Sequence, residues 1–196
     1  MAHASIISVY SAPGPWVAPL NAGPALLPTT TNNFGMEIIA DPNSTGPAQI
    51  LFYNGNDSDA GWGLYLAGGV YDAFFGGVSF FGGALATAGQ DTALALVENN
   101  GVATFYVNGV AEGSQLDAYP NPPDSDPNSY LLFGESAGGG YTFGGTLSDA
   151  EIFTFAPGQF SPSDLETVPE PSTLALGLAG FACFAAWARH RRGLRT

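Results

Sequence analysis

Short apolar runs, separated by turn-forming residues about every eight to twelve residues, fill the sequence from Phe34 onward. The first of them read MEIIADP, QILFYNGN, GWGLYLAGG and DAFFGGVSFFGG. No stretch before Ser161 shows the period of an amphipathic helix. This spacing predicts an all-β sandwich or barrel in which each run forms a strand.

The strongest local signal is a hairpin predicted within residues 92–110, TALALVENNGVATFYVNGV. Two strands of alternating character, at 92–98 and 102–107, are joined by the turn residues Asn-Asn-Gly, and Asn108-Gly109 marks a second tight turn. Asn-Gly pairs suit the positive φ angles of hairpin turns, so the hairpin is expected from local chemistry alone.

On either side of this hairpin the sequence is less regular. Residues 1–33 are expected to form an edge strand and then a long loop, since prolines at positions 13, 15, 19, 24 and 28 exclude a central strand. Another loop is expected at the acidic, proline-rich residues 117–129. The last strands are predicted at 130–134 and 145–155, before a short Ser-capped turn in FSPSDL.

The stretches FYVNGV, YLLFGES and FGGTLSDAEIFTFAPGQFSPSDL follow one another in an order that resembles laminin-G-like domains. The earlier stretch EIIADPNSTGPAQILFYNGNDSDAGWGLYL resembles the opening strands of the same family. The resemblance covers roughly residues 34–165 and implies a concanavalin A-type jelly-roll sandwich. One departure is Gln90-Asp91, which stands where the family usually has a tryptophan before the hairpin strand.

The C-terminal residues 166–196 do not continue the pattern of short strands. They contain a proline-rich segment that is expected to be extended, here called the corner, made of Val168, Pro169, Glu170, Pro171, Ser172 and Thr173. The uncharged apolar run at 173–188 predicts a single hydrophobic helix of roughly 24 Å, short of the ~30 Å hydrocarbon core but within reach of it. Arg189, Arg191 and Arg192 follow in the basic tail at 189–196 and are expected to stop transfer on the cytoplasmic side.

This order of corner, apolar span and basic end resembles the PEP-CTERM sorting signal of Gram-negative bacteria. The resemblance implies transient processing by an exosortase, with the body periplasmic while residues 173–188 sit in the inner membrane, and then delivery to the cell surface or extracellular matrix. The alternative is a plain C-terminal membrane anchor. Because Met1 to Tyr10 lacks a full export signal but contains Ala2-His3-Ala4, we expect that a signal peptide precedes this start.

Charge is separated along the chain. All 17 acidic residues precede the apolar run, the four arginines follow it, and the chain has no lysine. This field repels phosphate backbones and attracts cations, so nucleic-acid binding is not expected. The only cysteine, Cys183, lies in the apolar run, so the body can form no disulfide.

Most catalytic arrangements are excluded by residue type. The only histidines are His3 and His190, near the two ends of the chain, so no Ser-His-Asp or Cys-His site is expected in the body. Paired carboxylates of the glycosidase kind remain, at Asp57/Asp59, Asp124/Asp126 and Asp149/Glu151. None forms the Glu-x-Asp-x-Glu run of the β-glucanases that share the jelly roll.

Calcium is the cofactor that these acids suit best, because it prefers clusters of oxygen ligands in loops. The candidate ligands are Asp124, Asp126 and Asn128, and less firmly Asp57 and Asp59. The alternative is an acidic loop exposed to water.

Aromatic residues between 62 and 81, foremost Trp62, Tyr65 and Tyr71, are candidates for stacking on sugar rings. The alternative is that these rings fill the core of the sandwich. The sequence therefore favours a non-catalytic, exported surface or matrix protein associated with biofilm exopolysaccharide. The alternatives are a carbohydrate-binding module in the matrix and a divergent glycoside hydrolase.

Overall fold

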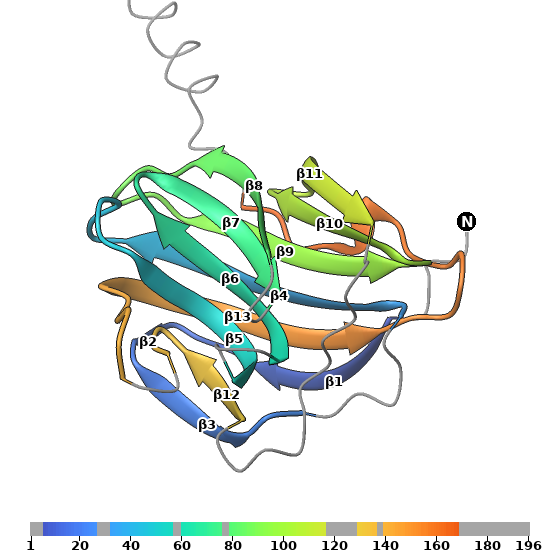
Figure 1. Cartoon of the computed structure of the whole chain (residues 1–196), viewed down its shortest axis with the longest axis horizontal. Coiled ribbons are helices and arrows are strands. Elements are labelled where there is room, and N and C mark those ends of the chain that lie inside the picture. Colours follow the sequence, from blue (N-terminus) through green and yellow to red (C-terminus); the bar gives the residue numbers. More distant parts are fainter. Residues whose placement is uncertain are drawn as a thin grey trace, which may run out of the picture.

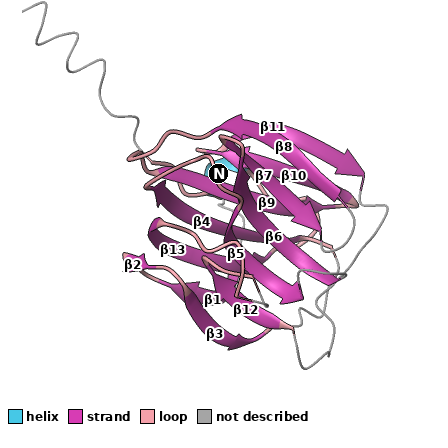
Figure 2. Ribbon diagram, turned by 60° about the vertical axis from the view of Figure 1, so that its left-hand side comes forward, coloured by secondary structure: helices cyan, strands magenta, loops and turns pink. Residues whose placement is uncertain are grey.

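The chain folds into two antiparallel sheets packed face to face, as the computed structural model shows (Figure 1). The structure describes residues 6–26, 32–56, 60–75, 79–116, 129–136 and 139–168. Strands dominate these residues, and the helical structure among them is one short 3-10 turn (Figure 2). The predicted all-β jelly-roll fold is therefore confirmed, whereas the expected C-terminal helix lies outside the described residues.

The seven-stranded sheet pairs segments from both ends of the chain. Its strands, in spatial order, are β1 (Ile7–Ala12), β13 (Gly145–Thr154), β4 (Phe34–Pro42), β9 (Thr92–Asn99), β10 (Val102–Val107) and β11 (Val110–Leu116), with β2 (Trp16–Val17) beside β13. The predicted hairpin is confirmed as β9 and β10. Asn100 and Gly101 have φ angles of 53° and 79° at its turn, which is the left-handed geometry that Asn and Gly tolerate.

The six-stranded sheet lies in front of the first in Figure 1. Its strands, in spatial order, are β3 (Leu20–Pro24), β12 (Tyr130–Phe133), β5 (Gln49–Asn56), β6 (Ala60–Ala67), β7 (Val70–Phe75) and β8 (Ser79–Leu85). Both β2 and β3 fall in the stretch predicted as a loop. Pro24 ends β3, which is an edge strand and therefore tolerates a missing backbone donor.

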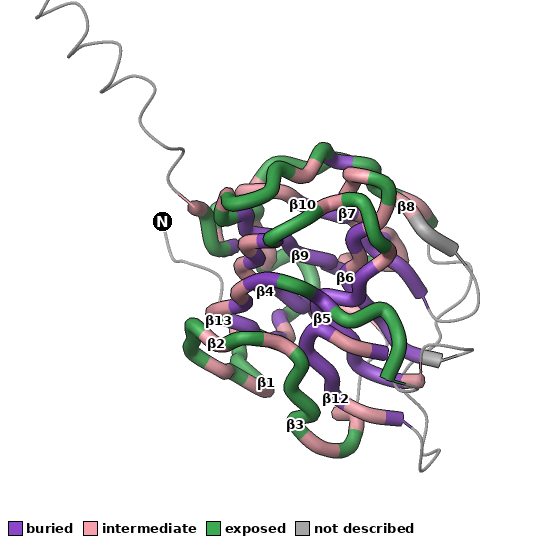
Figure 3. Tube along the Cα trace, turned by 90° about the vertical axis from the view of Figure 1, so that its left-hand side faces the viewer, coloured by how far each residue is buried: buried purple, intermediate pink, exposed green. Residues whose placement is uncertain are grey.

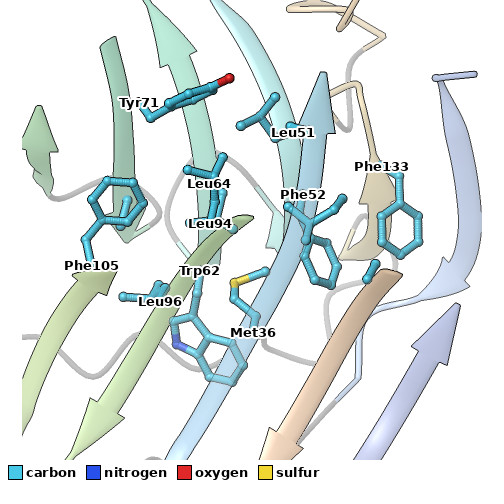
Figure 4. Close-up of a cluster of buried hydrophobic side chains, with 14 of the residues drawn as sticks. Met36, Leu51, Phe52, Trp62, Leu64, Tyr71, Leu94, Leu96, Phe105 and Phe133 are labelled. Carbon is cyan, nitrogen blue, oxygen red and sulfur yellow. The ribbon is translucent and has the colours of Figure 1, made fainter. Parts of the chain in front are cut away.

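Large apolar side chains from both sheets fill the space between them (Figure 4). The ring of Trp62 stacks on that of Phe34 across the core, with centroids 3.9 Å apart. Each fully buried Leu or Phe contributes about 1.5–3 kcal/mol to folding, so this core supplies most of the favourable energy. The described backbone is buried along the central strands and exposed along β1, β2 and β3 (Figure 3).

A second cluster covers the outer face of the seven-stranded sheet. Residues 155–167, here called the strap, follow β13 and place Phe155 and Leu165 against Val97 and Phe153. The predicted Ser-capped turn is confirmed within the strap, where Ser161 caps the 3-10 turn Pro162–Asp164 and its N–H donates to Asp164 Oδ2 at 2.9 Å. The backbone therefore continues to pack against the body up to the sorting signal.

Candidate functional site

Aromatic rings gather on the outer face of the six-stranded sheet, opposite the face that lines the core. Tyr53 and Phe74 are stacked with centroids 4.9 Å apart, and Tyr65 meets the edge of Phe74 at 5.9 Å. Tyr141, from the loop after β12, meets Tyr65 at 6.1 Å. We call Tyr65, Tyr141 and the neighbouring Asp72 the aromatic patch.

Strand alternation explains why these side chains share a face. On β6, Trp62, Leu64 and Leu66 point into the core, so Gly63 and Tyr65 face outward. Tyr65 lies opposite Ile50 on β5 and Asp72 on β7, and Gly63 lies opposite Tyr53 and Phe74. A Cβ on Gly63 would overlap both of those rings, so the glycine is what lets them pack flat against the sheet.

The patch stands on a buried support. Ile50, Tyr53 and Phe74 are buried beneath it, and the Tyr53 hydroxyl donates to the carbonyl of Asn56 at 3.0 Å. A β-bulge at Ile50/Phe52 turns both Leu51 and Phe52 into the core and keeps Tyr53 outside. The exposed rings therefore rest on side chains that cannot move freely.

A single buried glutamine fixes the loop that carries Tyr141. The Gln49 amide nitrogen donates to the carbonyl of Ser44 at 3.0 Å, and its oxygen accepts from the Gly144 N–H at 2.9 Å. The Ile50 N–H donates to the Tyr141 carbonyl at 2.8 Å. Tyr141 is nonetheless 55% exposed, so its backbone is held in place while its ring is open to solvent.

Two groups of the patch titrate away from their ordinary ranges. Partial burial raises the pKa of Asp72, and a hydrogen bond from the Gly83 N–H works in the opposite direction. Burial, and then the nearby Tyr141, raises the pKa of Tyr65, so its phenol stays protonated at neutral pH. The patch thus offers neutral rings beside a carboxyl group.

The predicted sugar-stacking residues divide between this face and the core. Tyr65 lies in the patch, but the prediction is wrong for Trp62 and Tyr71, which are 2% and 0% exposed in the core. The sequence marks neither residue as inward, because the runs around them are apolar on both faces. Asp72 and Tyr141 were not identified from the sequence. The sequence signal for this outer face was the position of Tyr65 between Leu64 and Leu66, because neighbouring residues in a strand point to opposite faces.

Other predicted sites lie outside the described residues. These are the calcium candidates Asp57, Asp59, Asp124, Asp126 and Asn128, the sorting residues Pro169, Glu170, Pro171, Ser172 and Thr173, and the basic Arg189, Arg191 and Arg192. Among the residues that the structure describes, no His, Cys, Asp or Glu side chains group into a metal site of three or more. No described helix is long and apolar enough to cross a membrane.

A second perturbed carboxyl lies under the strap, on the opposite side of the sandwich. Burial raises the pKa of Glu37 to about 7, the Glu166 N–H counters this by donating to Glu37 Oε2 at 3.1 Å, and the carboxylates of Glu151 and Glu166 raise it further. Glu37 is only 5% exposed. Because the strap covers it, its raised pKa reflects packing rather than an open catalytic site.

Family comparison agrees with this architecture. Residues 18–159 match the family described as the concanavalin A-like lectin/glucanases superfamily. The chain belongs to this superfamily. Residues 167–192 match the PEP-CTERM protein-sorting motif, which confirms the second resemblance and implies an exported protein with a transient membrane attachment. Comparison with curated protein sequences gives no match.

Several of the solved structures that resemble this chain are parts of sialidases or of an arabinanase. The CBM40 domain of the Ruminococcus gnavus IT-sialidase has a TM-score of 0.60 and 16% identity, over 81% of this chain and 97% of that one. Domain 4 of the arabinanase AbnA from Geobacillus stearothermophilus, solved with arabinotriose, has a TM-score of 0.52 and 20% identity, over 67% of this chain and 64% of that one. A leech trans-sialidase matches with a TM-score of 0.58 and 18% identity, over 84% of this chain but only 28% of the enzyme.

Proposed function

We propose that this protein is a non-catalytic, exported polysaccharide-binding protein of the cell surface or extracellular matrix. The sorting signal supports export, since it implies recognition by an exosortase and transient attachment to the membrane. The binding role is supported by the aromatic patch, where Tyr65 and Tyr141 present ring surface beside Asp72.

The exposed ring of Tyr141, carried on a hydrogen-bonded loop beside Tyr65, is the observation that carries the binding role. Sugar rings have an apolar C–H face that packs on aromatic side chains and a polar edge of hydroxyl groups that needs hydrogen-bond partners. Tyr65 and Tyr141 offer the first kind of contact and Asp72 the second. The stacked rings of Tyr53 and Phe74 beneath them hold the patch before any ligand arrives, which reduces the entropy lost on binding.

A binding role also fits the neighbouring structures better than a catalytic one. The two neighbours of comparable length are a carbohydrate-binding domain of a sialidase and a single domain of an arabinanase. The sialidase enzymes match over only about a quarter of their length, 28% for the leech enzyme, so their activity does not transfer to this chain. We expect no release of reducing sugar from any polysaccharide that the protein binds, and a positive reducing-sugar assay would favour the glycoside hydrolase alternative.

Affinity electrophoresis of the full chain in detergent, through gels that contain soluble polysaccharides, tests the binding role. At least one polysaccharide should retard the protein, and Tyr65→Ala should lower the apparent affinity by up to about tenfold, since stacking contributes about 0.5–1.5 kcal/mol. Leu116→Ala is the control, because Leu116 is 78% exposed on the edge of the other sheet. Equal loss in both variants would contradict the site.

The delivery role and the calcium prediction have separate tests. In an exosortase-bearing host, replacing Pro169, Glu170 and Pro171 with alanine should leave the chain unprocessed and membrane-bound, as judged by its size and fractionation. Unchanged processing would contradict the sorting role and favour the alternative, a plain C-terminal membrane anchor. Calcium binding by the acidic loops stays a prediction, and equal melting temperatures with calcium and with chelator would contradict it.

A further inference from the structure

We infer that the aromatic patch selects uncharged glycans and that Asp72 excludes sugars that carry a carboxylate. This inference rests on the proposed function, because it names the class of ligand for the same site. It is independent of which neutral polysaccharide is bound.

The first step concerns what the protein can offer to an anion. The chain has no lysine, and its four arginines all follow residue 188, so residues 6–168 contain no ammonium or guanidinium group. A sugar carboxylate brought onto the patch would lose water and gain no cationic partner, which is unfavourable even at a partly exposed site. The acidic residues of the body add a repulsive field that slows the approach of any anion.

The second step concerns the position of Asp72. It lies directly opposite Tyr65 on the neighbouring strand, and side chains in such a pair have Cβ atoms about 4.5–5.5 Å apart. A sugar stacked on the Tyr65 ring therefore has its edge within reach of the Asp72 carboxyl group. A hydroxyl at that edge donates a charge-assisted hydrogen bond, whereas a carboxylate there meets a like charge.

The surroundings of Asp72 leave room for a ligand. Its partner on β8 is Gly82, where an added Cβ would overlap the core ring of Phe105. The next residue, Gly83, donates its N–H to the Asp72 carboxyl group, and a Cβ on Gly83 would meet no atom within 4 Å. The absence of a side chain at Gly83 thus leaves space on the β8 side of Asp72. Tyr65 lies opposite Asp72 on the other side, and Tyr141 lies next to Tyr65.

The two structural neighbours illustrate the two classes of ligand. The R. gnavus CBM40 domain has been solved with α2,3-sialyllactose, a sugar that carries a carboxylate. The arabinanase domain has been solved with arabinotriose, which is uncharged. This chain shares the fold of both, but its charge composition matches only the requirements of the uncharged class.

A paired panel of polysaccharides tests the inference on the full chain. Neutral arabinan, galactan and glucan are compared with polygalacturonate and polysialic acid by affinity electrophoresis, with chelator and with added calcium. We expect retardation by a neutral polymer and none by either anionic polymer in both conditions. Asp72→Asn should weaken binding of the neutral polymer about tenfold, as expected for loss of one charged hydrogen bond. Asp72→Lys should permit binding of an anionic polymer.

Controls separate the possible outcomes. Glu112→Gln removes an exposed carboxyl group from the edge of the other sheet and should leave the whole panel unchanged, and melting temperatures verify that each variant is folded. Binding of an anionic polymer by the unmodified chain, with or without calcium, would overturn the inference while leaving the proposed function intact. Retardation by no polymer at all would reject the proposed function itself, and the inference with it.

Discussion

Replacing Glu37 with glutamine should change how the stability of the protein depends on pH. The carboxyl group is buried under the strap, and its pKa of about 7 compares with an ordinary value of 4.5. At 1.36 kcal/mol for each pKa unit, this difference corresponds to about 3 kcal/mol, the extra free energy of ionising Glu37 in the folded protein compared with the unfolded chain. Glutamine keeps an oxygen that accepts from the Glu166 N–H and removes the charge.

The sign follows from which state holds the proton more tightly. Between pH 4.5 and pH 7 the folded protein keeps a proton on Glu37 that the unfolded chain has released. The free energy of unfolding therefore falls as the pH rises through this window, and the contribution of Glu37 is constant above it. Glu37→Gln should match the original chain near pH 4 and exceed its stability by up to about 3 kcal/mol at pH 8.

Thermal melting followed by circular dichroism between pH 4 and pH 9 measures the effect. A gain of about 3 kcal/mol corresponds to roughly 6–12 °C in melting temperature for a chain of this size. The difference between the two pH profiles reports Glu37 together with its electrostatic coupling to Glu151 and Glu166, since the acidic residues are otherwise common to both chains. Glu112→Gln, on the exposed edge strand β11, should follow the original profile. Parallel profiles for Glu37→Gln and the original chain would refute the reasoning.

Further substitutions test the support of the patch and the strap. Gly63→Ala crowds the two stacked rings on the outer face, so it should lower stability by about 1–3 kcal/mol and weaken glycan binding. Gly35→Ala is the control, because it crowds a ring on the opposite sheet and should lower stability by a similar amount. Its folded fraction should bind glycan as the original chain does. Equal losses of binding in Gly63→Ala and Gly35→Ala would contradict the site. Gln49→Leu removes the hydrogen bonds that fix the Tyr141 loop and should cost about 1–3 kcal/mol and weaken binding, both measured as above. Leu165→Ala should loosen the strap by about 2 kcal/mol and speed its cleavage in limited proteolysis, and an unchanged cleavage rate would show that Leu165 does not anchor it.

The parts of the fold that were predictable are those that local chemistry decides. Asn100 and Asn108 sit at left-handed positions that few other residues tolerate, so the hairpin turn between β9 and β10 and the turn after β10 could be read directly. The capped turn at Ser161 has the same origin, because its hydrogen bonds join neighbours in the sequence. The strands β2 and β3 were missed because they depend on pairing with β13 and β12, which local sequence does not reveal.

The site was harder to predict, because it depends on which face of the sheet each side chain occupies and on contacts between residues far apart in the sequence. Trp62 and Tyr65 lie close together in one strand, yet only alternation decides that the first is in the core and the second outside. In β5 a bulge breaks the alternation, so QILFYN does not reveal that Tyr53 faces outward. Tyr141 joins the patch through a loop that a buried Gln49 holds, a contact between segments far apart in the chain.

The strap also determines how the body is oriented while the tail is still in the membrane. Leu165 is packed against the seven-stranded sheet, and eight residues further on Thr173 begins the expected membrane-spanning run, a tether of at most roughly 28 Å. In the proposed membrane-attached state this tether would keep the strap side of the sandwich near the bilayer, whereas the rings of Tyr65 and Tyr141 lie on the outer face of the other sheet. Under the proposed function, a newly exported molecule would reach surrounding polymer before its release, and cleavage beyond Val168 would free it without removing any side chain of its cores.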